Sequence, residues 1–200
     1  MSMQPNVSDN SNVAGDELQP KWRQAFLTFG DKSWGTVKMG KDLGIFAGQA
    51  ILNDMTLLGV GGAAATKSGA STSLGGIGTG YIYPSWKGQI SYTTPNMNGF
   101  TATVGITNPN QHGDSSVQTT YQDRFGLEGQ LQYEFSNGKV WVSGASYEYQ
   151  NGDGAADLNW DASAVDLGAS INFGNVGLVA YVYDTKGVGA TMFGGSGRAG

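Results

Sequence analysis

Few residues of this sequence have the types and spacing that catalysis or metal binding requires. There is no cysteine, and the only histidine, His112, lies in a polar stretch, so thiolate chemistry is excluded and a Ser-His-Asp triad is disfavoured. Asp157, Asn159 and Asp161 form a short cluster of oxygen ligands, but the glycine and the distal glutamate of a calcium-binding hand are missing, so a solvated loop is favoured. The sequence predicts no catalytic residue, no metal site and no cofactor, and we expect no enzyme activity.

One segment resembles a phosphate-binding loop. Residues 35–41 read Gly-Thr-Val-Lys-Met-Gly-Lys and match the first seven positions of that motif. Asp42 follows where serine or threonine should hold magnesium, and a carboxylate there would repel phosphate. The segment also alternates between polar and apolar residues, as a β-strand does. We therefore interpret it as a strand and not as a nucleotide site.

The composition indicates β-structure with one apolar and one weakly polar face. Only 14% of the residues are charged, against about 25% in an ordinary soluble domain, and 33 are glycine. The formal net charge of −5 argues against nucleic acid as a partner. No apolar run approaches the roughly 20 residues of a transmembrane helix. A transmembrane strand needs only about 9–11 residues, half of them apolar, so a membrane protein remains compatible with the sequence.

Alternation with a period of two starts at Trp22 and predicts eight strands. The pattern is clearest in residues 125–136, where apolar side chains at odd positions face away from Glu128, Gln130 and Glu134. A half-buried sheet of a soluble sandwich would alternate in the same way, so this pattern alone does not separate a sandwich from a barrel. The predicted strands span residues 22–30, 35–41, 86–94, 100–107, 124–136, 139–150, 162–174 and 176–184.

The connections between these strands are alternately short and long. Tight connections at 31–33, 95–99, 137–138 and 174–175 alternate with long ones, of which 42–85 is the longest. An up-and-down membrane barrel has short turns at one end and long loops at the other, whereas a Greek-key sandwich has no reason for this order. We therefore predict an all-β fold, a transmembrane antiparallel up-and-down β-barrel. Residues 1–21 and 185–200 read as loops.

Aromatic residues gather near the ends of the predicted strands, as they do at the two interfaces of a transmembrane barrel. The pattern predicts one belt at the short turns and a second at the opposite strand ends. The first belt would contain Phe29, Trp34, Phe100, Phe135, Trp141 and Phe173, and the second Tyr147, Tyr149, Tyr181 and Tyr183.

The order of several motifs resembles the trimeric general diffusion porins of Gram-negative bacteria. The matching pieces are Arg23-Gln-Ala-Phe26, then residues 35–41, then Asn53-Asp54-Met55 in the long loop, and further on residues 90–95 with Gly99-Phe100. The resemblance implies a homotrimeric channel in the outer membrane, in contact with the lipid bilayer and lipopolysaccharide, through which ions and small hydrophilic solutes diffuse. Because relatives have about sixteen strands, it also implies that the chain is the middle part of such a barrel.

The resemblance also implies a pore constriction. In that family the long loop folds into the barrel, and its acids face basic residues on the wall. Residues 42–85 would be this loop, although the second acid of the family's loop is missing. Strand parity puts Lys38 and Lys41 on opposite faces, so one of them needs a bulge to reach the pore. The residues predicted to form the constriction are Asp54, Lys41, Lys87, Lys38 and Asp42, and those predicted on the pore wall are Glu128, Glu134 and Asp166.

A second interpretation stays open beside the porin. Eight strands are enough for a small outer-membrane barrel with a filled interior or for a soluble β-sandwich, and either would act as a binding or adhesion module.

Overall fold

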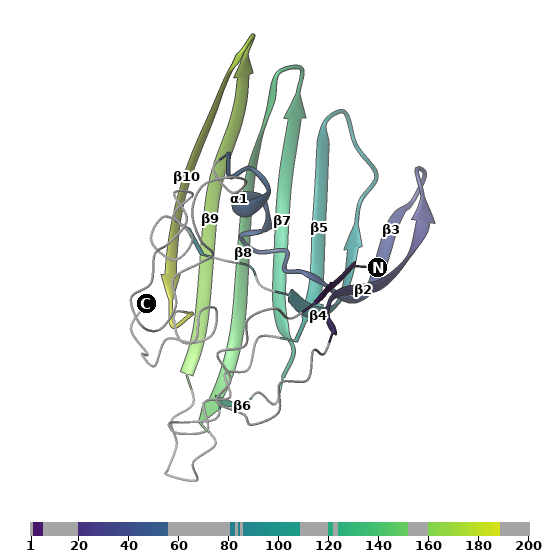
Figure 1. Cartoon of the computed structure of the whole chain (residues 1–200), viewed down its shortest axis with the longest axis vertical. Helices are drawn as coiled ribbons and strands as arrows, with labels where there is room; N and C mark the ends of the chain where they lie inside the picture. The colour runs from purple at the N-terminus through teal and green to yellow at the C-terminus, as the bar shows by residue number, and fades with distance from the viewer. Residues whose placement is uncertain are drawn as a thin grey trace.

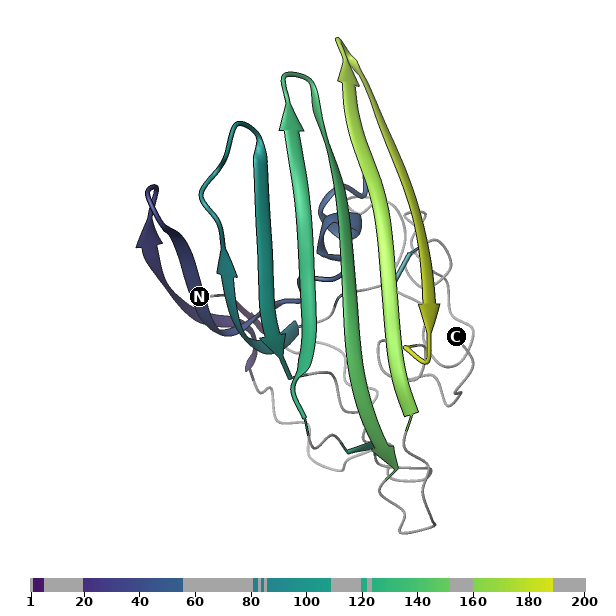
Figure 2. The same cartoon turned by 180° about the vertical axis from the view of Figure 1, so that it is seen from behind.

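The computed structural model describes residues 2–5, 20–55, 81–82, 84, 86–108, 120–121, 124–151 and 160–188. These residues form one antiparallel sheet that curves into part of a cylinder (Figures 1 and 2). The strands are β1 (Ser2–Pro5), β2 (Pro20–Asp31), β3 (Gly35–Leu43), β4 (Trp86–Thr93), β5 (Phe100–Thr107), β6 (Thr120–Tyr121), β7 (Gly126–Phe135), β8 (Gly138–Asn151), β9 (Trp160–Phe173) and β10 (Val176–Lys186).

The topology is up-and-down, because each long strand pairs with its neighbour in the chain. The order across the sheet is β1-β2-β3-β4-β5-β7-β8-β9-β10, and the two-residue strand β6 pairs with β8. The eight predicted strands are confirmed as the eight longer strands, and the fold is all-β with one short helix, α1 (Gly48–Leu52). The sheet does not close, since β10 pairs only with β9 among the described strands, so it is a partial barrel.

Several boundaries differ from the expectation; β2 begins at Pro20 and β10 continues to Lys186, so both extend into segments predicted to be loops. Residues 2–5 form the short strand β1 against the start of β2, where a loop was predicted, because their backbone groups find partners at residues 20–24. The turn between β7 and β8 contains residues 136–137, one residue earlier than expected, since Gly138 already pairs with Phe135. Strand β3 continues to Leu43, so Asp42 is a strand residue rather than the first residue of the loop.

The four short connections lie together at one end of the sheet, the upper end in Figure 1. Their sequences explain why the chain reverses there. At the β2–β3 turn the Asp31 carboxylate accepts hydrogen bonds from the main-chain N–H and the hydroxyl of Ser33, both at 2.6 Å. At the β9–β10 turn Gly174 has φ of +59°, which a residue without Cβ adopts at little cost. The alternation of connection lengths is therefore built into local turn chemistry.

The two faces of the sheet have opposite polarity, and the apolar face is the exposed one. The convex face carries large apolar side chains on every long strand, and the concave face carries polar side chains that are buried. This is the reverse of a soluble half-buried sheet, in which the apolar face is covered. One exposed apolar residue per long strand is Leu27, Met39, Ile90, Val104, Leu127, Val142, Leu167 and Val182.

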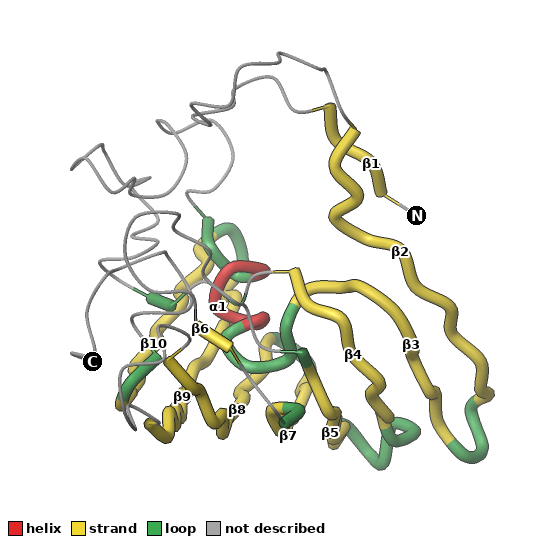
Figure 3. Tube along the Cα trace, turned by 90° about the horizontal axis from the view of Figure 1, so that it is seen from below, coloured by secondary structure: helices red, strands yellow, loops and turns green. Residues whose placement is uncertain are grey.

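The chain after β3 turns onto the concave side of the sheet (Figure 3). Residues 44–55, which contain α1, form the inner segment, and this name is used for them below. The helix is too short to be stable by itself, so its position depends on contacts with the sheet. Within the described ranges, no helix has the length and apolar character needed to cross a membrane.

The aromatic residues do not all lie where the two belts require. Phe29, Phe100 and Phe173 are exposed on the convex face at the short-turn end, as predicted. Trp141 and Tyr147 are instead buried on the concave face, so their assignment to a belt is wrong. Tyr181 also points inward, since its hydroxyl donates to Asp166, and Tyr183 stacks beside it. The distance of a residue from the strand end predicts its position along the strand, but it does not predict on which face of the sheet the side chain lies.

Candidate pore constriction

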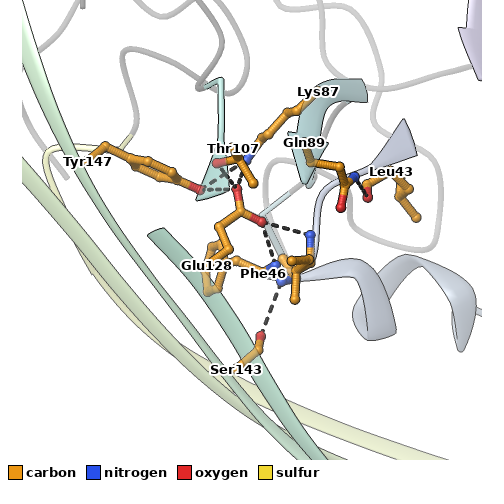
Figure 4. A network of polar contacts seen from close by, with 10 residues as sticks. Leu43, Phe46, Lys87, Gln89, Thr107, Glu128, Ser143 and Tyr147 are labelled. Atoms are coloured by element: carbon orange, nitrogen blue, oxygen red, sulfur yellow. Dashed lines mark hydrogen bonds and ion pairs between the residues drawn. The ribbon is translucent and has the colours of Figure 1, made fainter. Parts of the chain in front are cut away.

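One carboxylate on β7 holds the first residues of the inner segment against the wall. The Oε2 atom of Glu128 accepts hydrogen bonds from the main-chain N–H groups of Ile45, at 2.7 Å, and Phe46, at 2.8 Å (Figure 4). Even-numbered residues of β7 face the concave side, which is why Glu128 can reach the segment. Two N–H groups that would otherwise be buried without partners are therefore satisfied by one charged acceptor.

The other oxygen of Glu128 is held by three wall residues. Its Oε1 atom accepts hydrogen bonds from Lys87 Nζ at 2.6 Å, from the Tyr147 hydroxyl at 2.8 Å and from the Thr107 hydroxyl at 3.2 Å. Figure 4 shows these groups converging from neighbouring strands. The Lys87 and Glu128 side chains are 1% and 0% exposed, so the pair lies beneath the inner segment and not in open solvent. Full pairing is what makes such a buried charge tolerable.

A second set of contacts fixes the start of α1. The Ser143 hydroxyl accepts a hydrogen bond from the main-chain N–H of Ala47 at 3.3 Å and donates to Asp166 at 2.6 Å. Tyr181 donates to the other oxygen of Asp166 at 3.0 Å. Asp166 on β9 therefore supports the inner segment indirectly, through a hydroxyl on β8, and it too is buried.

Apolar packing completes the attachment. Phe46 and Ala47 are fully buried, in a cluster on the concave side of β8 and β9. The wall contributes small residues here, Ala145, Ala162 and Ala164, which leave room for the phenyl ring of Phe46. Burying a phenylalanine side chain stabilises the folded state by about 1.5–3 kcal/mol. The packing of Phe46 and the hydrogen bonds to Glu128 therefore hold the same short stretch of the inner segment.

A separate charged pair lies on β3. Lys38 and Asp42 form an ion pair, and Asp42 also accepts a hydrogen bond from the Gln24 side-chain amide on β2 at 2.7 Å. These even-numbered residues of β3 share the concave face. The Lys38 side chain is 34% exposed and that of Asp42 is 8% exposed, so the cation is the more accessible member.

The far end of the inner segment reaches the β9–β10 side of the sheet. Asp54 accepts a hydrogen bond from the Tyr81 hydroxyl at 2.6 Å, and the Tyr81 ring meets the Tyr181 ring edge to face. The terminal methyl of Met55 lies so close to Gly177 of β10 that a Cβ there would come within 2.8 Å of it. The inner segment thus crosses the concave face from β3 to β10.

Space remains on the β2–β5 side of the inner segment. A pocket of about 280 Å³ lies between the segment and the wall, and this pocket is called the passage below. The inner segment lines it with Gly44, Ile45, Gly48, Gln49 and Leu52, and the wall lines it with Gln24, Lys38, Asp42, Leu43, Gln89, Ser91, Thr93, Thr103 and Gln130.

The predicted constriction residues are brought together only in part. Lys38 and Asp42 line the passage, whereas Lys87 is buried under the inner segment with Glu128. Lys41 lies on the convex face, because it pairs with Ala25 and shares the parity of Met39, and β3 has no register shift that would turn it inward. The structure therefore does not bring Lys41 to the other charged residues. Of the predicted wall acids, Glu134 is the exposed one and accepts a hydrogen bond from Gln132 at 2.8 Å.

Sequence reasoning missed the residues that complete these networks. Tyr147, Ser143 and Thr107 contribute hydroxyl groups to them, and Gln89 donates from its amide to the Leu43 carbonyl at 2.8 Å. The available signal was parity, since Gln89, Thr107 and Ser143 each stand next to an apolar residue of the other face, whereas Tyr147 lies between Ser146 and Glu148 and gives no such signal. The other predicted cluster, Asp157 and Asn159, lies outside the described residues, and no group of metal-ligating side chains occurs in the part that is described.

An apolar convex face, a polar concave face and a chain segment held inside the curve define the wall of a transmembrane β-barrel with an inward-folded loop. A comparison with protein families agrees with this class: the family model described as Gram-negative porin matches residues 3–196. The chain belongs to the Gram-negative porin family. No curated protein and no solved structure gives a match.

Proposed function

We propose that the protein forms the wall of a water-filled channel in the outer membrane, through which ions and small hydrophilic solutes diffuse passively. The observation that carries this proposal is the inner segment, which is held over a polar concave face while the convex face is apolar and exposed. A segment in this position narrows an aqueous lumen without filling it. Membership of the porin family supports the same conclusion.

The open edges of the sheet bear on how the wall is completed. In lipid every backbone N–H and C=O group needs a partner within the protein, and β10 has an unpaired edge among the described strands. We propose that further strands close the ring, as in the sixteen-stranded barrels that the motifs resemble. A homotrimer in contact with lipopolysaccharide is proposed on that resemblance, and chemical cross-linking in detergent would test it by the expected ladder of one, two and three copies.

The charged residues have different proposed roles. Lys38 and Asp42 line the passage and are proposed to meet solutes there, whereas Asp54 lies on the β9–β10 side of the inner segment, outside that lining. Lys87 and Glu128 are proposed to set the position of the segment. Glu134 and Asp166 belong to the concave wall, the first exposed and the second buried. Lys41, on the convex face, is not part of the proposed constriction.

Conductance measurements test the channel. The protein is expressed from its full reading frame, purified in detergent and added to planar bilayers, where stepwise increases of current are expected. Absence of steps, together with stability of the protein in buffer without detergent, would contradict the channel and favour a soluble binding module. The Glu128→Gln variant is a useful companion, because loosening the inner segment should change the size or noise of the steps without abolishing them.

A further inference from the structure

We infer that the passage admits small neutral or zwitterionic solutes that carry an apolar group, and that it does not select ions of one sign. This inference rests on the proposed channel function, and it concerns the chemistry of the solute rather than the existence of the channel. It is carried by the side chains on the two sides of the passage.

The inner segment presents an apolar surface to the passage. Ile45 and Leu52 line it from this side; Ile45 is buried against the wall, whereas Leu52 is 68% exposed although it lies inside the curve of the sheet. The described residues of the inner segment carry one charge, that of Asp54, and Asp54 is engaged by the Tyr81 hydroxyl on the β9–β10 side. An apolar group of a solute can therefore contact Leu52 and shed part of its hydration there.

The facing wall is polar but mostly uncharged. Amides and hydroxyls line it, and each of these groups can either donate or accept a hydrogen bond, so they hold a zwitterion or a neutral solute without preference for the sign of charge. They come from β2, β4, β5 and β7, and they are Gln24, Gln89, Ser91, Thr93, Thr103 and Gln130.

The charges that line the passage are not arranged to create a field across it, and the other charges of the concave face, Glu134, Lys139 and Asp166, are not among its lining residues. Lys38 and Asp42 neutralise one another on one strand, and Lys87 and Glu128 do so beneath the inner segment. A transverse field needs cations on one side of the lumen and anions on the other, and it penalises apolar solutes because it orients the water they must displace. Without such a separation that penalty is reduced.

Leucine and asparagine test the inference, because they are zwitterions of nearly equal mass and differ in the polarity of the side chain. Proteoliposomes containing the protein from its full reading frame are placed in an isosmotic solution of either amino acid, and the initial swelling rates are compared. We expect leucine to enter at least as fast as asparagine. Entry of asparagine several-fold faster than leucine would overturn the inference. Entry of neither would instead contradict the channel itself.

Variants of Leu52 locate the effect. Leu52→Met keeps an apolar surface and should leave the leucine-to-asparagine ratio unchanged, whereas Leu52→Asp should lower it by about threefold, since it removes the apolar contact and sets an acid opposite Lys38. Because Leu52 is 68% exposed, both variants should fold. Equal ratios in the two variants would overturn the assignment to this residue.

The ion selectivity of the unmodified protein gives a second readout that needs no variant. Under a gradient of potassium chloride the cation and anion permeabilities should agree within about twofold, because no net charge faces the passage from the described wall. A permeability ratio of ten or more in either direction would overturn the absence of a transverse field, even if leucine enters well.

Discussion

The Lys87 ammonium lies 2.6 Å from the Glu128 carboxylate, and the main chain of Ile45 and Phe46 covers the pair. Both charges occupy wall positions that a lumen would ordinarily expose, yet neither is accessible to solvent. We therefore propose that their role is mechanical and that they hold the inner segment against the wall.

Removal of the Glu128 charge should destabilise the protein strongly. Glu128→Gln leaves the Lys87 ammonium buried without a counter-charge, which typically costs about 3–5 kcal/mol in the free energy of unfolding. Denaturant unfolding in detergent measures the loss. The double variant Lys87→Met with Glu128→Gln should recover a large part of this lost stability, because no unpaired charge remains. A loss in the double variant equal to the sum of the losses in the two single variants would contradict the coupling.

Lys38 and Lys41 provide a matched pair for selectivity. Lys38→Met should raise cation permeability over anion permeability by about twofold, since Asp42 then faces the passage without its partner. Lys41→Met should leave the ratio unchanged, because that side chain lies on the convex face. Reversal potentials in a salt gradient measure both, and a shift in the Lys41 variant would contradict the assignment of the two faces.

The polarity of the two faces can be tested at neighbouring positions of β7. Leu131→Lys places a charge at the middle of the strand on the convex face, where lipid contact should cost about 2–4 kcal/mol. Gln130→Lys places the same charge on the concave face and should be tolerated. The yield of folded protein in lipid vesicles, read from its heat-dependent mobility on a gel, measures the difference. Equal yields would mean that lipid does not cover the convex face.

The packing of Trp141 depends on a glycine of β9. A Cβ on Gly168 would lie 2.0 Å from the indole ring, so Gly168→Ala must displace the ring and should lower the free energy of unfolding by about 1–3 kcal/mol. Gly129→Ala is the control, since a Cβ there lies 3.7 Å from its nearest neighbour, an ordinary contact. The two midpoints of denaturant unfolding should therefore separate, and coincident midpoints would rule out the steric explanation.

The strands could be predicted because their information is local. A period of two over ten residues, as in β7, and turn residues such as Gly174 are read directly from neighbouring positions. The face of each residue follows from the same parity. The position of a residue along a strand and the face on which it lies are independent, so both are needed to predict that Trp141 and Tyr147 are buried on the concave face.

The attachment of the inner segment could not be predicted in the same way. The hydrogen bond from the N–H of Ile45 to Glu128 joins residues 83 positions apart, and it involves a main-chain group that every residue type carries. Nothing in the identity of Ile45 therefore indicates a carboxylate partner. Parity assigns a charged residue such as Glu128 to the polar face, but the sequence does not show which part of that face another segment will cover.

The Glu128 carboxylate binds the inner segment by its main chain, and this has a consequence for how the protein can change. Substitutions at Ile45 or elsewhere along the passage side of the segment leave the two main-chain N–H groups in place. The side chains that line the passage can therefore change without loss of the hydrogen bonds to Glu128. A substitution at Leu52, for example, can change the lining of the passage while the hydrogen bonds that hold the inner segment to Glu128 stay in place.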